Sequence, residues 1–76
     1  MNTKMIIDKF NQNGKVQFKL FSLEYVIIKE NDKVAIYPII YDKQKKYYLS
    51  IDDALNNYTI YNETIVENDD RISNII

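Results

Sequence analysis

The sequence contains neither cysteine nor histidine, and it has only one glycine, one proline and one arginine among 76 residues. Without cysteine and histidine the chain can form no disulfide, no zinc finger, no cysteine or histidine nucleophile and no imidazole proton shuttle. A bound metal would have to be a hard cation held by oxygen ligands. The lone Gly14 cannot build a glycine-rich phosphate loop. We therefore expect no cofactor, no metal site and no enzymatic activity.

The chain also lacks any long apolar run. Asp8 and Lys9 interrupt the apolar residues near the start, so this segment lacks the continuous apolar region of a signal peptide. No segment approaches the roughly 20 apolar residues of a membrane-spanning helix. We therefore expect a cytoplasmic protein without membrane contact, folded as a single small α+β domain over residues 1–76. A domain of this size buries only about 60% of its unfolded surface, so self-association would add stability.

Four residue types dominate what is present. Isoleucine, lysine, asparagine and tyrosine number 13, 9, 9 and 7 and make up half of the chain. Their codons are rich in A and T, which indicates a low-GC bacterium and weakens the lysine and tyrosine counts as evidence for a binding surface. Charge is uneven: residues 1–49 carry a net +4 and residues 50–76 a net −5. Such polarity can drive head-to-tail association or docking on a charged partner, or can be a plain solvated surface.

Residues 25–41, YVIIKENDKVAIYPIIY, read as a β-hairpin around which the rest of the chain is organised. A two-residue loop would pair Glu30 with Lys33, and a three-residue loop would pair Glu30 with Val34; both registers are open. Pro38 has no N–H, so it must face away from a partner strand or lie at a bulge. We expect residues 25–30 to be the central strand and residues 34–41 to be an edge over all or part of their length.

The flanking segments predict the remaining elements. A helix over Thr3–Gln12 ends at Asn13-Gly14, and the alternation in KVQFKLF predicts a strand over residues 15–21. The later signals are a short fourth strand at 47–49, a helix N-capped by Ser50, an extended stretch at 59–61 and a final helix from Thr64 to about Ser73. This order, α-β-β-β-(β)-α-β-α, predicts a three- to four-stranded antiparallel meander with short helices on one face.

Two pairs of adjacent carboxylates, Asp52-Asp53 and Asp69-Asp70, are the only acidic clusters that could suggest catalysis. Neighbouring residues on a helix lie about 100° apart, so their carboxylates do not converge on one point. We interpret the first pair as favourable charges at a helix N-terminus and the second as solvated surface.

Protein–protein association is the function that the sequence favours. The chain has ten aromatic residues and at least two strands that are apolar on both faces, and three short helices can hardly cover both sides of a sheet. The expected interface residues lie on the edge strand: Tyr37, Pro38, Ile39 and Tyr41. We expect a non-catalytic interaction module that binds itself, as a homodimer or larger homo-oligomer, or another protein.

Two alternatives remain open. The first is weak binding of single-stranded nucleic acid, with lysines for phosphates and tyrosines for base stacking, through Lys43, Lys45, Lys46, Tyr47 and Tyr48. A sequence pI near 5.2 and the near absence of arginine argue against it. The second is an acidic inhibitor, of the kind that phages or mobile elements encode, which docks on a basic partner through residues 50–76.

Overall fold

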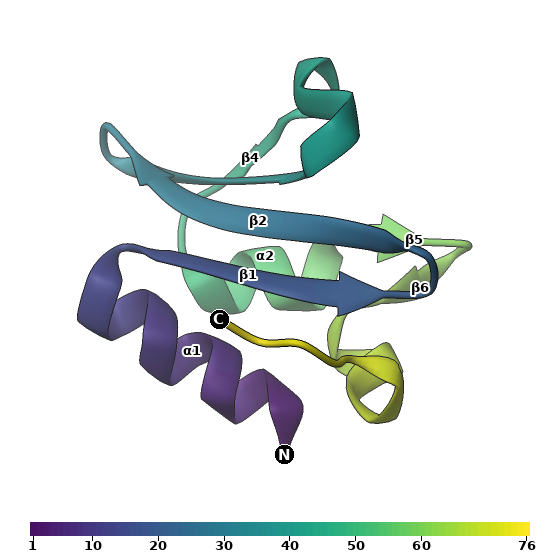
Figure 1. Ribbon diagram of the computed structural model, residues 1–76. Coiled ribbons are helices and arrows are strands. Elements are labelled where there is room, and N and C mark those ends of the chain that lie inside the picture. Colours follow the sequence, from purple (N-terminus) through teal and green to yellow (C-terminus); the bar gives the residue numbers. More distant parts are fainter.

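The computed structural model describes residues 1–76 and confirms the α+β fold (Figure 1). The elements follow in the order α1 (Asn2–Asn13), β1 (Lys15–Leu20), β2 (Leu23–Glu30), β3 (Lys33–Pro38), the 3-10 helix η1 (Ile39–Gln44), β4 (Lys46–Tyr48), α2 (Ile51–Asn57), β5 (Thr59–Ile60), β6 (Glu63–Thr64) and the 3-10 helix η2 (Val66–Arg71). None of the helices has the length and apolar character that crossing a membrane requires.

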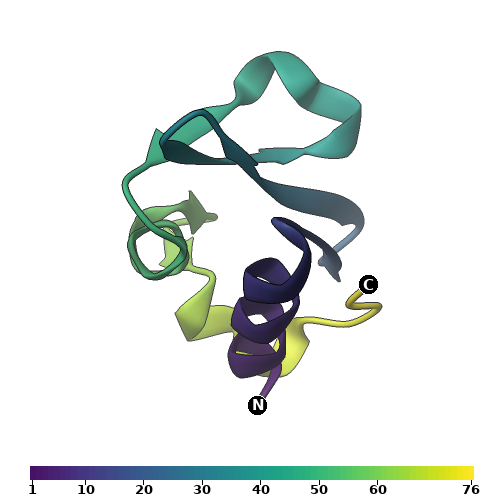
Figure 2. The same cartoon turned by 90° about the vertical axis from the view of Figure 1, so that its left-hand side faces the viewer.

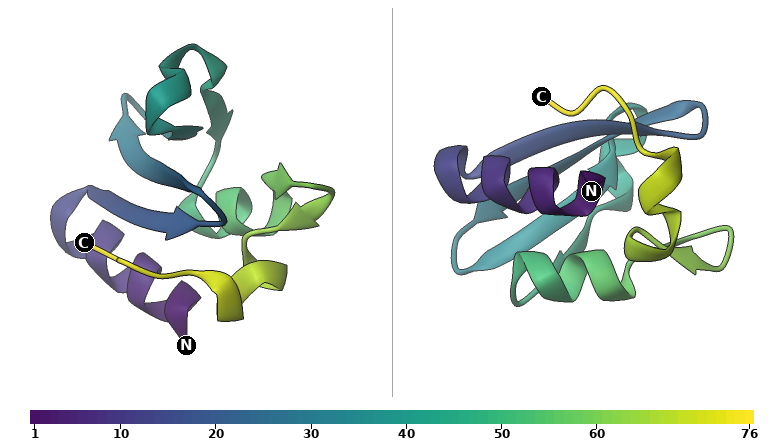
Figure 3. Two further views of the ribbon diagram at one scale, coloured as in Figure 1. Left: turned by 45° about the vertical axis from the view of Figure 1, so that its right-hand side comes forward. Right: turned by 90° about the horizontal axis from the view of Figure 1, so that it is seen from below.

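Strands β1 to β4 form an antiparallel meander in chain order. Helices α1 and α2 both lie against one face of this sheet, which we call the inner face (Figures 1 and 3). The other face, which we call the outer face, has no α-helix over it. Only η1 rises on that side, and it packs against β2 and β3 (Figure 2). The sheet is therefore covered by both α-helices on one face and by η1 alone on the other, where Val26 and Ala35 are buried.

The sequence leaves two registers open for the β2–β3 hairpin, and the structure has the one with a two-residue loop. Glu30 pairs with Lys33 and Ile28 with Ala35 across the strands. The loop residue Asn31 has a φ of 58°, in the left-handed region that asparagine tolerates better than most residues.

The expectation that residues 34–41 form an edge holds over only part of their length. Residues Val34 to Ile36 pair with β4, so β3 is an interior strand there. Lys33, Tyr37 and Pro38 have no partner on that side, and residues 39–41 leave the sheet in η1. In an antiparallel ladder alternate residues turn their main-chain groups to opposite neighbours. The nitrogen of Pro38 therefore faces away from β2 and toward the side where β4 would have to continue. With no N–H to donate there, the pairing with β4 stops and η1 begins.

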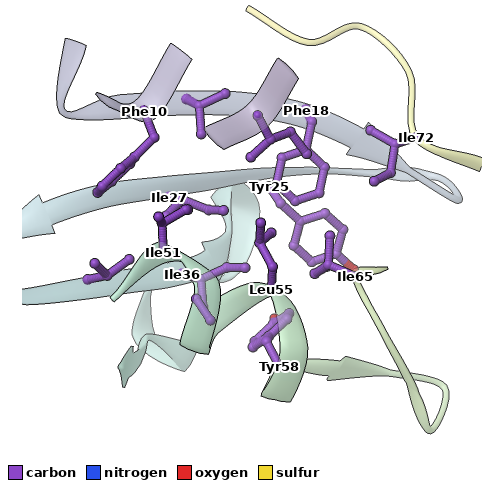
Figure 4. Packing of buried hydrophobic residues seen from close by; sticks show 14 of the residues in the cluster. Phe10, Phe18, Tyr25, Ile27, Ile36, Ile51, Leu55, Tyr58, Ile65 and Ile72 are labelled. Carbon is purple, nitrogen blue, oxygen red and sulfur yellow. The ribbon is translucent and has the colours of Figure 1, made fainter. Parts of the chain in front are cut away.

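The inner face carries the core (Figure 4). Val16, Phe18 and Leu20 of β1 are all buried, as the alternation in this segment predicts. The ring of Phe18 stacks on Tyr25 of β2 with centroids 5.7 Å apart, and Tyr25 meets the edge of Tyr58 at 6.2 Å. Residues from β2, from β3, from both α-helices and from the last third of the chain complete the cluster: Ile6, Phe10, Ile27, Val34, Ile36, Ile51, Ala54, Leu55, Ile65 and Ile72.

The last third of the chain differs most from the secondary structure that the sequence predicts. The extended residues 59–60 pair with Glu63 and Thr64 in a small hairpin, β5–β6, which the sequence does not signal. Its loop residues Tyr61 and Asn62 both have positive φ, 54° and 67°, as in a type I′ turn. The predicted helix start at Thr64 is a capping box, because Glu67 N–H donates to Thr64 Oγ1 and Thr64 N–H donates to Glu67 Oε1. The helix that it opens is nevertheless 3-10 and ends at Arg71.

Residues 73–76 lie along the free side of β1 (Figure 3), with Asn74 in the left-handed region at a φ of 52°. Lys19 and Ser73 exchange two main-chain hydrogen bonds of 2.8 and 3.0 Å, and Gln17 and Ile76 exchange two of 3.2 and 2.9 Å. Of the apolar residues in this last part of the chain, Ile65 and Ile72 are buried, whereas Ile76 is exposed. The chain thus closes one edge of its own sheet.

The structure contradicts the interpretation of Asp69 as a solvated surface residue. Its carboxylate accepts the N–H of Thr3 at 2.7 Å and the N–H of Asn2 at 3.4 Å, at the start of α1. Helix α1 has no N-cap side chain of its own, since Met1 precedes it. Asn2 completes the contact by donating its side-chain amide to the carbonyls of Asp69 and Ile72. The two ends of the described chain are joined at this point.

Candidate interaction surface

Exposed apolar side chains are concentrated in one short segment. The chain has eleven large hydrophobic residues that are exposed, and five of them fall between residues 39 and 49: Ile39, Ile40, Tyr41, Tyr47 and Leu49. We call residues 37–49, which run through the end of β3, η1 and β4, the η1–β4 surface. Its η1 part lies at the top of the molecule in Figures 1 and 2, on the far side of the sheet from α1 and α2, and its β4 part is the edge strand of the sheet.

The local sequence explains why these residues are not buried. Pro38 ends the β3–β4 pairing, and the next six residues coil into η1, in which no residue is buried. Tyr41 has a non-helical φ of −122° and kinks this helix. Ile40 and Tyr41 keep 68% and 49% of their surface exposed. The segment therefore places apolar side chains outside the core, where a small domain would gain by covering them.

A shallow groove lies beside η1 on the outer face. Ile39 and Ile40 form one wall and Leu23 contributes to the other, around a space of about 310 Å³. Lys19 and Glu24, which face each other across β1 and β2, also line it. The groove combines an apolar wall with charges of both signs, which is a usual composition for the rim of a protein interface.

A polar cluster surrounds Glu30 at the other end of the outer face. The Lys45 ammonium lies 3.1 Å from one carboxylate oxygen, and the Tyr47 hydroxyl donates to the other at 2.8 Å. The same ammonium lies 5.2 Å above the ring of Tyr37. The hydrogen bond from Tyr47, followed by that from Lys45, lowers the pKa of Glu30, and the bond to Glu30 raises the pKa of Tyr47. This network holds Lys45 and Tyr47 against the outer face.

The five residues predicted to contact nucleic acid do not form one free surface. Lys45 and Tyr47 are both engaged by Glu30, and Tyr48 is half-buried against the inner core. Lys43 and Lys46 are exposed. The carboxylate of Glu30 thus lies among the side chains that would have to bind phosphate and stack on bases. Binding of nucleic acid through these residues stays a prediction.

The four residues predicted for a protein interface differ in accessibility. Ile39 and Tyr41 are exposed, Tyr37 is half-buried beneath Lys45, and Pro38 is buried. Sequence reasoning did not single out Ile40 and Leu49, which are the most exposed apolar residues of the η1–β4 surface at 68% and 79%. The signal for Ile40 was the unbroken apolar run after Pro38, which cannot alternate between two faces of a strand.

The chain has a second exposed aromatic contact, which the sequence does not signal. Phe21 and Tyr61, at the tips of the β1–β2 and β5–β6 hairpins, meet edge to face with centroids 5.3 Å apart. Both have positive φ, near 58° and 54°, which is uncommon for aromatic residues. Residues far apart in sequence thereby hold the two hairpin tips together at the surface.

Three of the six carboxylates of residues 50–76 accept hydrogen bonds from the backbone. Asp53 accepts the N–H of Leu49 at 3.2 Å, while Glu67 and Asp69 accept backbone N–H groups at the starts of η2 and α1. No three carboxylates converge closely enough to hold a metal ion. Half of the acidic residues of this third are therefore held by backbone N–H groups, Glu63 lies 4.0 Å from Arg71, and Asp52 and Asp70 are exposed without an ion pair.

Comparison with protein-family models, with curated protein sequences and with solved structures finds no match for this chain.

Proposed function

We propose that this protein is a non-catalytic interaction module that binds another protein chain through its η1–β4 surface. The observation that carries the proposal is the concentration of exposed apolar residues in η1 and β4. A segment of eleven residues, 39–49, holds five of the eleven exposed large hydrophobic side chains in a chain of 76. Association removes such surface from water at about 25 cal/mol per Å² of apolar area.

The polar groups around this surface support a protein partner over a nucleic acid. Glu30 holds Lys45 and Tyr47 on the outer face, so a carboxylate already neutralises the cation next to the exposed tyrosine. A polar rim of paired charges around an apolar centre is typical of protein interfaces. Phosphate binding would require breaking the Lys45–Glu30 pair or bringing phosphate next to a carboxylate.

The test is site-directed photo-cross-linking in the cells that naturally produce the protein. A benzophenone amino acid is placed at position 40 of η1 or, as the matched control, at position 5 of α1. Met5 is also an exposed apolar residue, but it lies on the helical side of the molecule. We expect position 40 to give a discrete protein adduct, identified by mass spectrometry, and position 5 to give none.

Competition shows whether the adduct depends on the apolar surface. An excess of unlabelled wild-type protein should reduce the adduct, and an excess of Ile40→Asp should not. Because Ile40 is 68% exposed, this substitution should change the free energy of unfolding by less than about 0.5 kcal/mol. The same adduct from positions 40 and 5, or an adduct with nucleic acid alone, would overturn the proposal.

A further inference from the structure

The two edges of the main sheet differ in how their main-chain groups are satisfied. On β1, the outward groups of Gln17 and Lys19 are bonded to residues 73–76. On β4, the register makes Lys46 and Tyr48 the residues whose main-chain groups face β3, because alternate residues turn to opposite sides. The N–H and C=O of Tyr47 therefore point away from the sheet. No other group of the chain bonds to them.

We propose that a second copy of this chain occupies the free edge, with β4 pairing antiparallel to β4 about a two-fold axis at Tyr47. This inference rests on the proposed function and names the partner. The two Tyr47 residues would exchange N–H···O=C bonds, and the two four-stranded sheets would join into one of eight strands. An isologous pairing of this kind closes after two copies and leaves no further β4 edge.

Charge complementarity supports the antiparallel arrangement. Pairing about Tyr47 sets Lys46 opposite Tyr48 of the second copy, and both side chains belong to the inner face. Asp53 lies beside the end of β4, where its carboxylate accepts the N–H of Leu49 at 3.2 Å. Its charge adds to burial in raising the pKa of the Tyr48 hydroxyl. Lys46 is exposed and makes no ion pair within its own chain. Each Lys46 thus faces an acidic group of the other copy, whereas a parallel pairing would set lysine against lysine.

Apolar contacts support the same arrangement on the outer face. The ring of Tyr47 is 49% exposed, and the pairing places the two Tyr47 rings side by side across the two-fold axis. Leu49, which is 79% exposed, comes to lie opposite Lys45 of the second copy and can pack on its aliphatic stem. Lysines often protect a free edge from pairing. Here Lys45 is held over Tyr37 by Glu30, so it does not obstruct the edge.

The first experiment measures the oligomeric state of the wild-type protein by sedimentation equilibrium. Because the edge is short, we expect a weak interface, with a dimer that appears between about 10 µM and about 1 mM. Amide hydrogen exchange across this range should show slower exchange at Tyr47 as the dimer forms. The amide of Lys19, already bonded to Ser73, should not change.

Two pairs of variants locate the contact. Tyr47→Pro removes the outward N–H and the ring, whereas the control Tyr47→Ala removes the ring alone. Proline is tolerated in an edge strand where its nitrogen faces solvent. We expect Tyr47→Pro to be monomeric throughout, with Tyr47→Ala retaining a weaker dimer. Lys46→Glu should raise the dissociation constant roughly tenfold, and Lys43→Glu, with the same charge change on η1, by less than about twofold.

The outcomes separate this inference from the proposed function. A wild-type protein that stays monomeric up to about 1 mM overturns the second copy as partner. A dimer that is insensitive to Tyr47→Pro and Lys46→Glu overturns the β4 pairing. If photo-cross-linking at position 40 captures a different protein while the chain stays monomeric, the proposed function holds and this inference fails. Circular dichroism of each variant verifies that a monomer is also folded.

Discussion

Asp69 shows how one side chain can connect segments that the sequence keeps far apart. It lies 66 residues after Thr3, yet it accepts the Thr3 N–H at 2.7 Å and so serves as the missing cap of α1. The hydrogen bonds from Thr3 lower the pKa of Asp69, and that from Asn2 adds to the effect. A carboxylate at a helix N-terminus is stabilised both by the free N–H groups and by the helix dipole.

Removing this carboxylate should therefore weaken the whole fold. We expect Asp69→Ala to lower the free energy of unfolding by about 1 kcal/mol, the usual cost of losing an N-cap. Asp70→Ala is the matched control, because Asp70 is exposed and makes no hydrogen bond through its side chain. Urea denaturation near neutral pH measures both variants, and equal losses would show that Asp69 does not act as a cap.

The same carboxylate should make stability depend on acid pH. Its pKa in the folded protein is below the ordinary value of 3.8. The stabilisation is therefore complete above that value and is lost as the pH falls through the lower, folded value. The difference in free energy of unfolding between the wild type and Asp69→Ala should accordingly shrink below about pH 4. A difference that stays constant into strong acid would contradict this assignment.

At the scale of elements, local signals fixed most of the boundaries. Ser50 accepts the N–H of Asp53 at 3.0 Å and opens α2, as its sequence pattern predicts. Helix α1 ends at Gly14, which has a φ of 71° and donates its N–H to the Phe10 carbonyl at 2.7 Å. These features depend on neighbouring residues alone, so a sequence can reveal them.

Gly14 offers a clean test of such a local signal. A β-carbon added at this position would meet no atom within 4 Å, so a substitution costs backbone energy and makes no clash. We expect Gly14→Ala to lower the free energy of unfolding by about 1 kcal/mol. Gly14→Asn should lower it by less, because asparagine tolerates the left-handed region better. Thermal or urea unfolding of both variants checks the order, and equal losses would refute the backbone explanation.

At the scale of the whole molecule, three aromatic rings, Phe18, Tyr25 and Tyr58, contact one another in series within a mostly aliphatic core between the sheet and the helices. Tyr58, at the end of α2, is buried to 7% exposure against Tyr25 (Figure 4). Burial, with a smaller contribution from Tyr25 and Tyr48, raises the pKa of Tyr58 from 10.0 to about 12. Burial likewise raises the pKa of Tyr25 and Tyr48.

These buried hydroxyls should make the fold unstable in alkali. A raised pKa in the folded state means that stability is complete below pH 10.0 and falls as the pH rises from there toward about 12. Tyr58→Phe should reduce the steepness of this fall, since phenylalanine has no proton to lose. Unfolding free energies measured between neutral pH and pH 11 test the effect, and a Tyr58→Phe protein with the wild-type slope would exclude Tyr58 as a cause.

The sequence by itself determined the α+β order, the alternation of β1, the hairpin of β2 and β3, the cap of α2 and the capping box at Thr64. Each is encoded by residues within a few positions of one another, because period, turn chemistry and capping act locally. The Asn31-Asp32 loop leaves the register of the hairpin open, and the two-residue register is seen only in the pairing of β2 with its neighbours in the sheet.

Tertiary structure alone decided which edge of the sheet is open. The placement of β4 beside residues 34–36, of residues 73–76 beside β1 and of Asp69 at the start of α1 all join segments distant in sequence. Such contacts form where packing and unsatisfied backbone groups favour them, and no local pattern records which partner is chosen. The exposed residues of η1 and the free Tyr47 edge, on which the proposed interface depends, follow from these choices.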